Sequence, residues 1–137
     1  MNVGLLLDTG PLVALLDRRD RHHAWTTSLL ESTRVPIATC DAVVSEACFV
    51  ARRAGVSADL VVELVAGLAR APGLVFAEHE GPVRKLLHRY RSVPMSFADA
   101  CLVRMSEVHA HARVITFDAD FRVYRRHGRQ VVPTVMP

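Results

Sequence analysis

Four acidic side chains in this chain of 137 residues are candidates for chemistry: Asp8, Glu46, Asp99 and Asp118. Carboxylates gathered in one place repel one another strongly unless cations neutralise them. Hard oxygen ligands without a convergent set of Cys or His side chains favour Mg²⁺ or Mn²⁺ over zinc. Two such ions can stabilise both the attacking and the leaving oxygen when a phosphodiester is displaced in line. If the fold brings them together, these acids predict a divalent-metal site for phosphodiester hydrolysis.

Short apolar, β-branched segments alternate with helical patterns along the whole chain. The expected strands cover residues 3–7, 35–39, 74–77, 113–116 and 130–132. The first expected helix starts at Pro11. Further helices are expected over 22–31, 41–53, 57–70, 81–90 and 96–108, with a short helical turn over 118–124. This alternation predicts an α/β fold with a mainly parallel sheet, in which polar sites gather at the carboxyl ends of the strands. No linker or repeat divides the chain, so we expect a single domain, 1–137.

Asp8 directly follows the first expected strand, which places it at the carboxyl edge of the sheet. An ordinary solvated turn residue is the simpler alternative. The run from Leu7 to Gly10 also matches the signature of retroviral-type aspartic proteases. Such a site needs an all-β fold, whereas Pro11 here favours the start of a helix.

Glu46 lies within an expected helix, in line with Val43, Phe49 and Val50 at spacings of three and four residues. Burying a bare carboxylate among apolar neighbours is very costly. The position therefore predicts that Glu46 is paired, protonated or bound to a metal. A basic partner from elsewhere in the fold remains an alternative.

Asp99 and Asp118 occupy the starts of two later helical segments. Ser96 and Asp99 fit the S-x-x-D capping pattern, so Asp99 has a local structural role available besides metal binding. Asp118 follows the strand at 113–116, and Asp120 is two residues further on. Asp120 either caps the short helix or binds the metal through water, so the choice of the fourth ligand stays open between these two acids.

The remaining composition excludes several classes of protein and of site. Cys40, Cys48 and Cys101 form no C-x-x-C pattern and are expected to be free thiols in a reducing compartment. The seven histidines lack a pair at metal-ligand spacing. No apolar run is long enough to span a bilayer, and the first residues do not look like a signal peptide, so we expect a cytoplasmic protein with no membrane partner.

Four segments of the sequence, taken in order, resemble the PIN domain and, within it, the VapC-type toxins of prokaryotic toxin–antitoxin pairs. They are residues 7–15 (LDTGPLVAL), Glu46, residues 96–100 (SFADA) and residues 116–121 (TFDADF). The resemblance implies a three-layer α/β/α sandwich and a Mg²⁺- or Mn²⁺-dependent endoribonuclease. It assigns the catalytic, metal-binding positions to Asp8, Glu46, Asp99 and Asp118, with support from Thr9, Ser96 and, as the alternative fourth ligand, Asp120. It also implies an RNA substrate, a small antitoxin partner and a homodimer.

The net charge of +3 is compatible with a polyanionic partner, and its clustering is more informative than its size. Basic residues gather over 84–91 and again over 122–129. From these clusters we expect contacts to the RNA backbone by Arg84, Lys85, Arg122 and Arg125. A solvated, arginine-rich surface without a ligand is the alternative.

Two other functions remain open from the sequence. A non-catalytic PIN-like module would bind RNA or protein without cutting it, although the complete acidic set argues against a degenerate member. A phosphohydrolase for small phosphate esters would need a second aspartate soon after its nucleophile, and the segment Asp8-Thr9-Gly10 lacks one.

Overall fold

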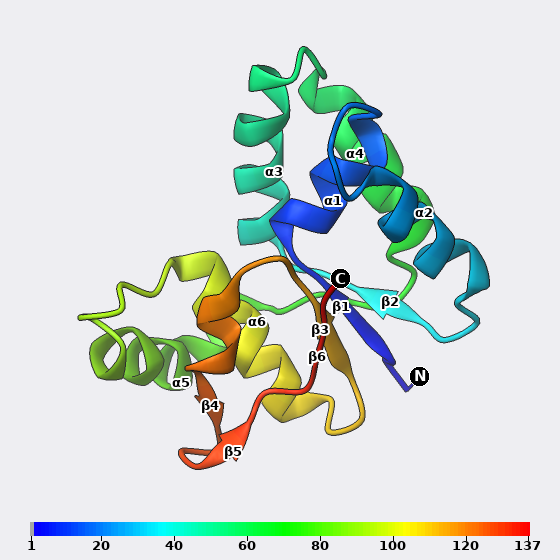
Figure 1. The fold of residues 1–137 in the computed structure, drawn as a ribbon. Helices are drawn as coiled ribbons and strands as arrows, with labels where there is room; N and C mark the ends of the chain where they lie inside the picture. Colours follow the sequence, from blue (N-terminus) through cyan, green and yellow to red (C-terminus); the bar gives the residue numbers. More distant parts are fainter. Residues whose placement is uncertain (1) are drawn as a thin grey trace.

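A parallel four-stranded sheet forms the centre of the computed structural model, which describes residues 2–137. The strand order is β2-β1-β3-β6, made of β2 (Ile37–Ala38), β1 (Leu5–Leu7), β3 (Arg113–Ile115) and β6 (Thr134–Val135). Leu7 lies opposite Ile115 in the register, so β1 and β3 end side by side (Figure 1). The carboxyl ends of the two central strands therefore open onto the same edge.

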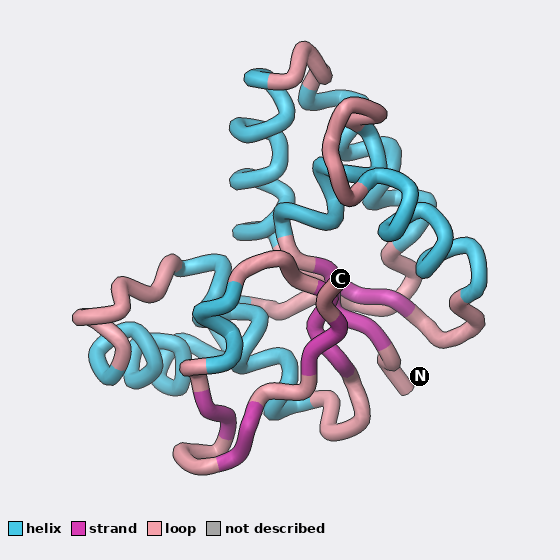
Figure 2. The backbone as a smooth tube through the Cα atoms, in the orientation of Figure 1, coloured by secondary structure: helices cyan, strands magenta, loops and turns pink. Residues whose placement is uncertain are grey.

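Helices cover both faces of this sheet. The helices are α1 (Thr9–Leu16), α2 (His23–Ser32), α3 (Asp41–Arg53), α4 (Ala58–Leu68), α5 (Phe76–Arg89) and α6 (Phe97–Val108). The first four pack together on one side, and α5 packs on α6, which contacts β1 and β3 on the other side (Figures 1 and 2). The predicted α/β/α sandwich with a mainly parallel sheet is confirmed.

The strands are buried on both faces, which explains the unbroken apolar run at the start of the chain. Leu6 and Leu7 point to opposite faces and both are completely buried. The three cysteines are free thiols that pack in or beside this core. Cys40 and Cys101 are buried and Cys48 is half-buried. Among residues 2–137, no helix is both long and apolar enough to cross a membrane.

Two expectations about the strands are wrong. The segment at 74–77 is not a strand, because α5 begins at Phe76, and the extended chain lies earlier, where the Ala71 amide donates to the Ile37 carbonyl of β2. The strand expected at 130–132 is β5 (Gln130–Val131), which pairs antiparallel with β4 (Arg125–Arg126) outside the central sheet. One edge of the central sheet is formed instead by β6.

The connection between α4 and α5 passes so close to β2 that Gly73 has no room for a side chain. A Cβ there would lie 2.5 Å from the backbone oxygen of Thr39. Gly73→Ala should therefore lower the free energy of unfolding by about 1–3 kcal/mol, measured by urea denaturation. Gly67→Ala is the matched control, since its Cβ would meet nothing within 4 Å and alanine favours a helix by about 0.5–1 kcal/mol. Equal losses in the two variants would contradict the assigned close approach.

Candidate metal centre

Asp8 is a buried carboxyl group at the end of the central strand, with 7% of its surface exposed. One carboxylate oxygen accepts a hydrogen bond from the Thr9 amide at 2.8 Å, which caps the start of α1. The other accepts a hydrogen bond from the Thr116 hydroxyl at 2.6 Å, just beyond the end of β3. The start of α1 and the end of β3 thus fix the orientation of this side chain.

Burial raises the pKa of Asp8 to about 6. The hydrogen bonds from Thr116 and Thr9 lower it, but they do not offset the desolvation, and the charges of Asp99 and Glu46 raise it further. A carboxyl group held in this way favours a proton or a cation.

Asp99 lies in the first turn of α6, as its capping pattern predicted. Its amide donates to the Ser96 hydroxyl at 3.0 Å, so Ser96 is the N-cap of the helix. The Tyr124 hydroxyl donates to the Asp99 carboxylate at 2.7 Å. Desolvation raises the pKa of Asp99, with a further contribution from the charge of Asp118. The cap and the carboxylate therefore serve one site, with the amide bound to Ser96 and the side chain oriented by Tyr124.

Glu46 extends from α3 toward the same acids, but the argument from its apolar row is wrong. Val43 is fully buried, whereas Glu46 is exposed and Phe49 is 60% exposed, so this row leaves the core as it runs along the helix. Partial desolvation still raises the pKa of Glu46, and the charges of Asp99 and Asp118 add to the rise. Proximity to other carboxylates, rather than burial in an apolar row, is the physical feature of this position.

Asp118 and Asp120 have different neighbours. Asp118 accepts a hydrogen bond from the Asp120 amide at 2.8 Å and caps the short 3-10 helix η1 (Ala119–Arg122). The charge of Asp118 raises the pKa values of Glu46 and Asp99, whereas Asp120 bears only on Tyr124 among these groups. The electrostatics therefore favour Asp118 over Asp120 as the fourth acid.

The four carboxyl groups, two on helices α3 and α6 and two at N-cap positions in loops, influence one another without a basic side chain among the causes of their pKa shifts. The Thr9 hydroxyl beside them is buried and lies near Glu46, whose pKa it lowers. This set of hard oxygen donors fits Mg²⁺ or Mn²⁺. No group of three His, Cys, Asp or Glu side chains among residues 2–137 is arranged to hold a metal ion in this structure, so waters would have to complete the coordination of an ion bound by these acids.

Two contacts in the site were not predicted from the sequence. Thr116 donates to Asp8 and also accepts the Asp118 amide at 3.0 Å, so one hydroxyl links two of the acids. Its place at the end of a strand was a usable signal. Tyr124 reaches Asp99 from 25 residues away, and no local pattern announces that contact.

The loop that carries Asp118 is held by packing on the start of α1. The Phe117 ring lies so near Gly10 that a Cβ there would approach it to 2.9 Å. The same ring contacts His22 and Trp25, with centroid distances of 4.5 and 6.1 Å. Glycine at position 10 therefore lets the two acid-bearing segments approach each other.

The basic residues expected to bind RNA are not equivalent. Arg84 forms an exposed ion pair with Glu80 at 3.3 Å, and Lys85 and Arg122 are exposed. The Arg125 guanidinium donates to three backbone carbonyls between residues 122 and 124, so its charge is used within the fold.

Known proteins resemble this chain in both sequence and fold. Residues 5–126 match the PIN domain family. The chain is 29% identical to Ribonuclease VapC26 of Mycobacterium tuberculosis over 132 residues, which cover 94% of this chain and 93% of that protein. Its fold is similar to the crystal structure of VapC20 of M. tuberculosis, described as a Sarcin-Ricin loop cleaving toxin. That comparison has a TM-score of 0.76 and 23% identity, over 88% of this chain and 94% of the other.

The raised pKa of Asp8 has a measurable consequence for stability. Between its ordinary pKa of 3.8 and about 6 in the fold, the folded state binds more protons than the unfolded state, so stability falls as pH rises through this range. In EDTA, we expect the free energy of unfolding to increase by up to about 3 kcal/mol from pH 7 to pH 4, and Asp8→Asn should flatten this dependence. Urea denaturation at several pH values measures it. An unchanged slope in the variant would contradict the role given to Asp8.

Proposed function

The chain belongs to the PIN domain family, and we propose that it is a Mg²⁺- or Mn²⁺-dependent endoribonuclease, the toxin of a toxin–antitoxin pair. The observation that carries the proposal is the mutual electrostatic influence of Asp8, Glu46, Asp99 and Asp118 at the carboxyl edge of the sheet. The similarity to Ribonuclease VapC26 supports the choice of RNA as the substrate. We also propose that residues 1–137 act as one domain in the cytoplasm.

Asp8 and Asp99 are the principal ligands in this proposal, and Asp118 completes the site. Thr116 holds one oxygen of Asp8, and Tyr124 holds one oxygen of Asp99, so each carboxylate is oriented before an ion arrives. A bound divalent cation supplies charge that stabilises the phosphate in the transition state and makes a water more acidic. Pre-oriented ligands lower the reorganisation that binding and reaction require.

Glu46 is assigned a different role, as a ligand or as the group that orients the attacking water. Its carboxylate has no ion pair among the described residues, and its raised pKa makes it a better proton acceptor than an ordinary glutamate. Hydrolysis forms a bond from the water oxygen to phosphorus and breaks the bond to one sugar oxygen. The proton lost by the water goes to a carboxylate oxygen such as that of Glu46.

Asp99→Asn tests the assignment directly. It should lower RNA cleavage in Mg²⁺ by at least about a hundredfold, because it removes a charged ligand and keeps the shape of the side chain. Asp59→Asn, on the exposed side of α4, is the control and should leave cleavage unchanged. Cleavage of a labelled RNA is measured with and without EDTA, and circular dichroism checks that the variants are folded.

Either of two results would overturn this function. Full activity of the folded Asp99→Asn variant would contradict the assignment of Asp99 as a metal ligand. RNA binding by the unaltered protein without Mg²⁺- or Mn²⁺-dependent cleavage would favour the non-catalytic module.

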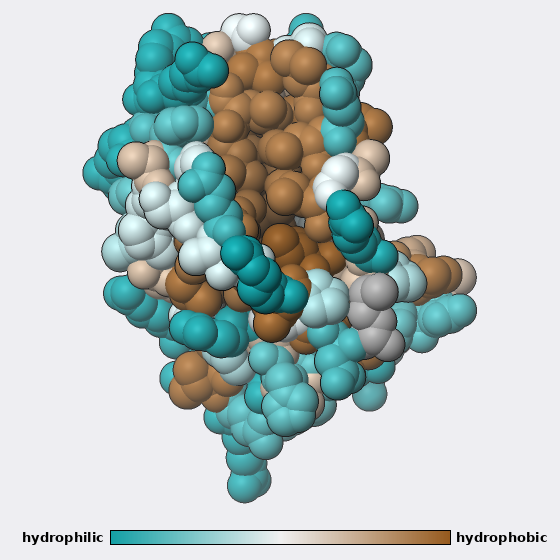
Figure 3. Space-filling view, turned by 90° about the vertical axis from the view of Figure 1, so that its right-hand side faces the viewer, coloured by the Kyte–Doolittle hydropathy of each residue, from teal (hydrophilic) through white to brown (hydrophobic). Residues whose placement is uncertain are grey.

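An apolar face supports the proposed antitoxin partner. Figure 3 shows a broad hydrophobic band on the side of α2 and α4, with polar surfaces on both sides of it. One hollow of about 390 Å³ on α4 is lined mainly by Leu16, Leu60, Leu64 and Leu68, and Trp25 and Leu29 line a second hollow on α2. We assign this face to an apolar segment of the antitoxin, and we propose separately that the toxin forms a homodimer.

Leu64→Glu places a charge in the hollow on α4 and should abolish co-purification with the proposed antitoxin. Glu78→Gln, at an exposed position of α5 outside this face, is the control and should retain the partner. Light scattering on the toxin alone measures the homodimer. Retention of the partner by a folded Leu64→Glu variant would show that the antitoxin binds elsewhere.

A further inference from the structure

The charges of this chain are separated along the sequence to an unusual degree. Residues 81–91 and 121–131 contain eight of the 17 basic residues and none of the 14 acidic ones. These two segments, which we call the basic lobe, carry a net charge of +8 with histidines neutral, and the other residues carry −5. The modest charge of the whole chain therefore conceals one strongly positive region.

The two segments of the basic lobe pack directly on each other. The Arg125 amide donates to the Tyr90 hydroxyl at 2.8 Å, and the Tyr90 and Tyr124 rings lie with centroids 5.2 Å apart. Gly128, in the turn between β4 and β5, faces Arg89, since a Cβ there would lie 3.8 Å from the guanidinium. The C-terminal half of α5 and the β4–β5 hairpin thus form one surface.

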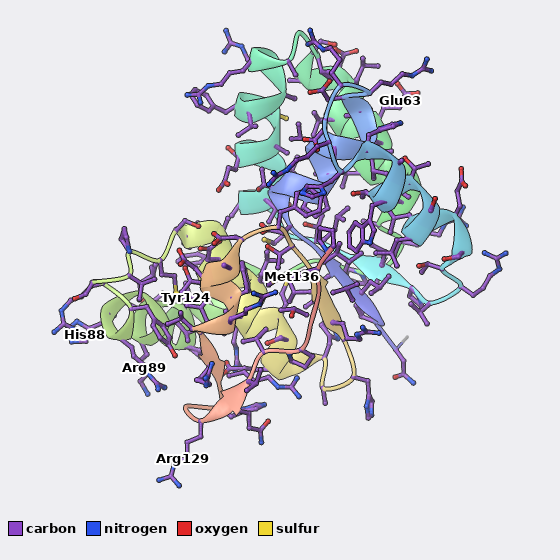
Figure 4. All side chains as sticks on the ribbon, in the orientation of Figure 1. Glu63, His88, Arg89, Tyr124, Arg129 and Met136 are labelled. Atoms are coloured by element: carbon purple, nitrogen blue, oxygen red, sulfur yellow. The ribbon has the colours of Figure 1, made fainter. Side chains whose placement is uncertain are left out.

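Four of the cations in the basic lobe remain available to a ligand. The side chains of Arg125 and Arg126 are turned inward and donate to backbone carbonyls. Lys85, Arg89, Arg122 and Arg129 are exposed and form no salt bridge within residues 2–137. Arg122 lies on η1, whereas the other three lie on α5 and the hairpin. Figure 4 shows Arg89 and Arg129 extending outward from α5 and from the hairpin.

A hollow of about 300 Å³ lies between these elements, lined by Pro82, Lys85, Leu86, Arg89, Glu107 and Gly128. Glu107 is the acidic residue in this lining, and its charge is already engaged. One of its carboxylate oxygens pairs with Arg104 at 3.2 Å, and the other accepts the His127 amide at 2.7 Å. Lys85 and Arg89 therefore face an anion without a competing free carboxylate in the hollow.

The Phe and Tyr residues of the basic lobe are not available for stacking. Tyr90, Phe121 and Tyr124 are all buried. Proteins that read single-stranded bases generally present exposed aromatic rings together with their positive charge. Charge without a stacking platform indicates contact with phosphates rather than with bases.

A side chain of the basic lobe contacts the acidic edge. Tyr124 belongs to the lobe and donates to the carboxylate of Asp99. A backbone bound on the lobe would therefore lie on the same rigid unit that carries one of the proposed metal ligands.

We propose that Lys85, Arg89 and Arg129 bind the phosphate backbone of the RNA away from the scissile bond and without regard to base sequence. This inference rests on the proposed ribonuclease function, because it assigns the polyanion to the substrate. It implies that part of the affinity comes from nucleotides that never reach the acidic edge. Short RNAs confined to that edge gain nothing from the lobe.

The test compares two triple variants with equal changes of charge. The first is Lys85→Ala, Arg89→Ala, Arg129→Ala, and the control is Arg52→Ala, Arg53→Ala, Arg70→Ala, three exposed cations outside the lobe. Binding of polyuridylate and polyadenylate is measured by fluorescence anisotropy over a series of salt concentrations. The lobe variant should lose affinity about tenfold or more and reduce the salt slope by about 2, since each lost contact removes about 0.7.

Cleavage data separate this inference from the function on which it rests. The lobe variant should raise the KM for a long RNA substrate while kcat and the cleavage of a short oligonucleotide stay nearly constant. If the unaltered protein cleaves no RNA but the lobe variant still weakens polyuridylate binding, the ribonuclease proposal fails and the binding surface stands.

Three results would overturn the inference itself. Equal RNA affinity and equal salt slope in the two triple variants would remove the lobe as the contact surface. A strong preference for one homopolymer would contradict contact with phosphates alone. Unchanged RNA binding combined with loss of the antitoxin would assign the lobe to a protein partner.

Discussion

The hydrogen bond from Thr116 to the buried Asp8 carboxylate is the contact on which the acidic edge depends. It exists because β1 and β3 are adjacent and parallel, with Leu7 opposite Ile115, so the residues that follow them meet. A shift of one residue in this register would turn Thr116 to the other face of the sheet. The helices on both faces bury the strands and make that shift very costly. Packing far from the site thus determines the geometry of the acids.

Most of the fold was predictable because its long elements carry strong local signals. The helix from Asp41 to Arg53 was predicted to within one residue, and Gly55 after it adopts the positive φ of 76° that ends such helices. The errors fall on short elements and on the start of α5, which begins at Phe76 rather than near Gly81. β4 and β6 contain two residues each, too few for any periodicity, and they exist only through pairing with distant strands.

The candidate site was predictable in its acids and less so in their environment. Asp8 and Asp99 were found by position, at a strand end and a helix start, and this information is local. Glu46 was chosen for a reason that does not hold, since helix α3 turns its row out of the core. Tyr124 could not be found, because its contact with Asp99 depends on how η1 folds back on α6. Polar contacts between distant segments need the tertiary structure.

The separation of charge in this chain also bears on how it meets another molecule in solution. A body with +8 in one region and −5 in the rest has a large electric dipole, although its net charge is small. An approaching polyanion attracts the positive end of such a dipole and turns it toward itself during diffusion. The carboxylates would repel the same polyanion if they met it first. Capture can therefore precede the approach of phosphate to the acidic edge, and the order of these two events is set by long-range forces.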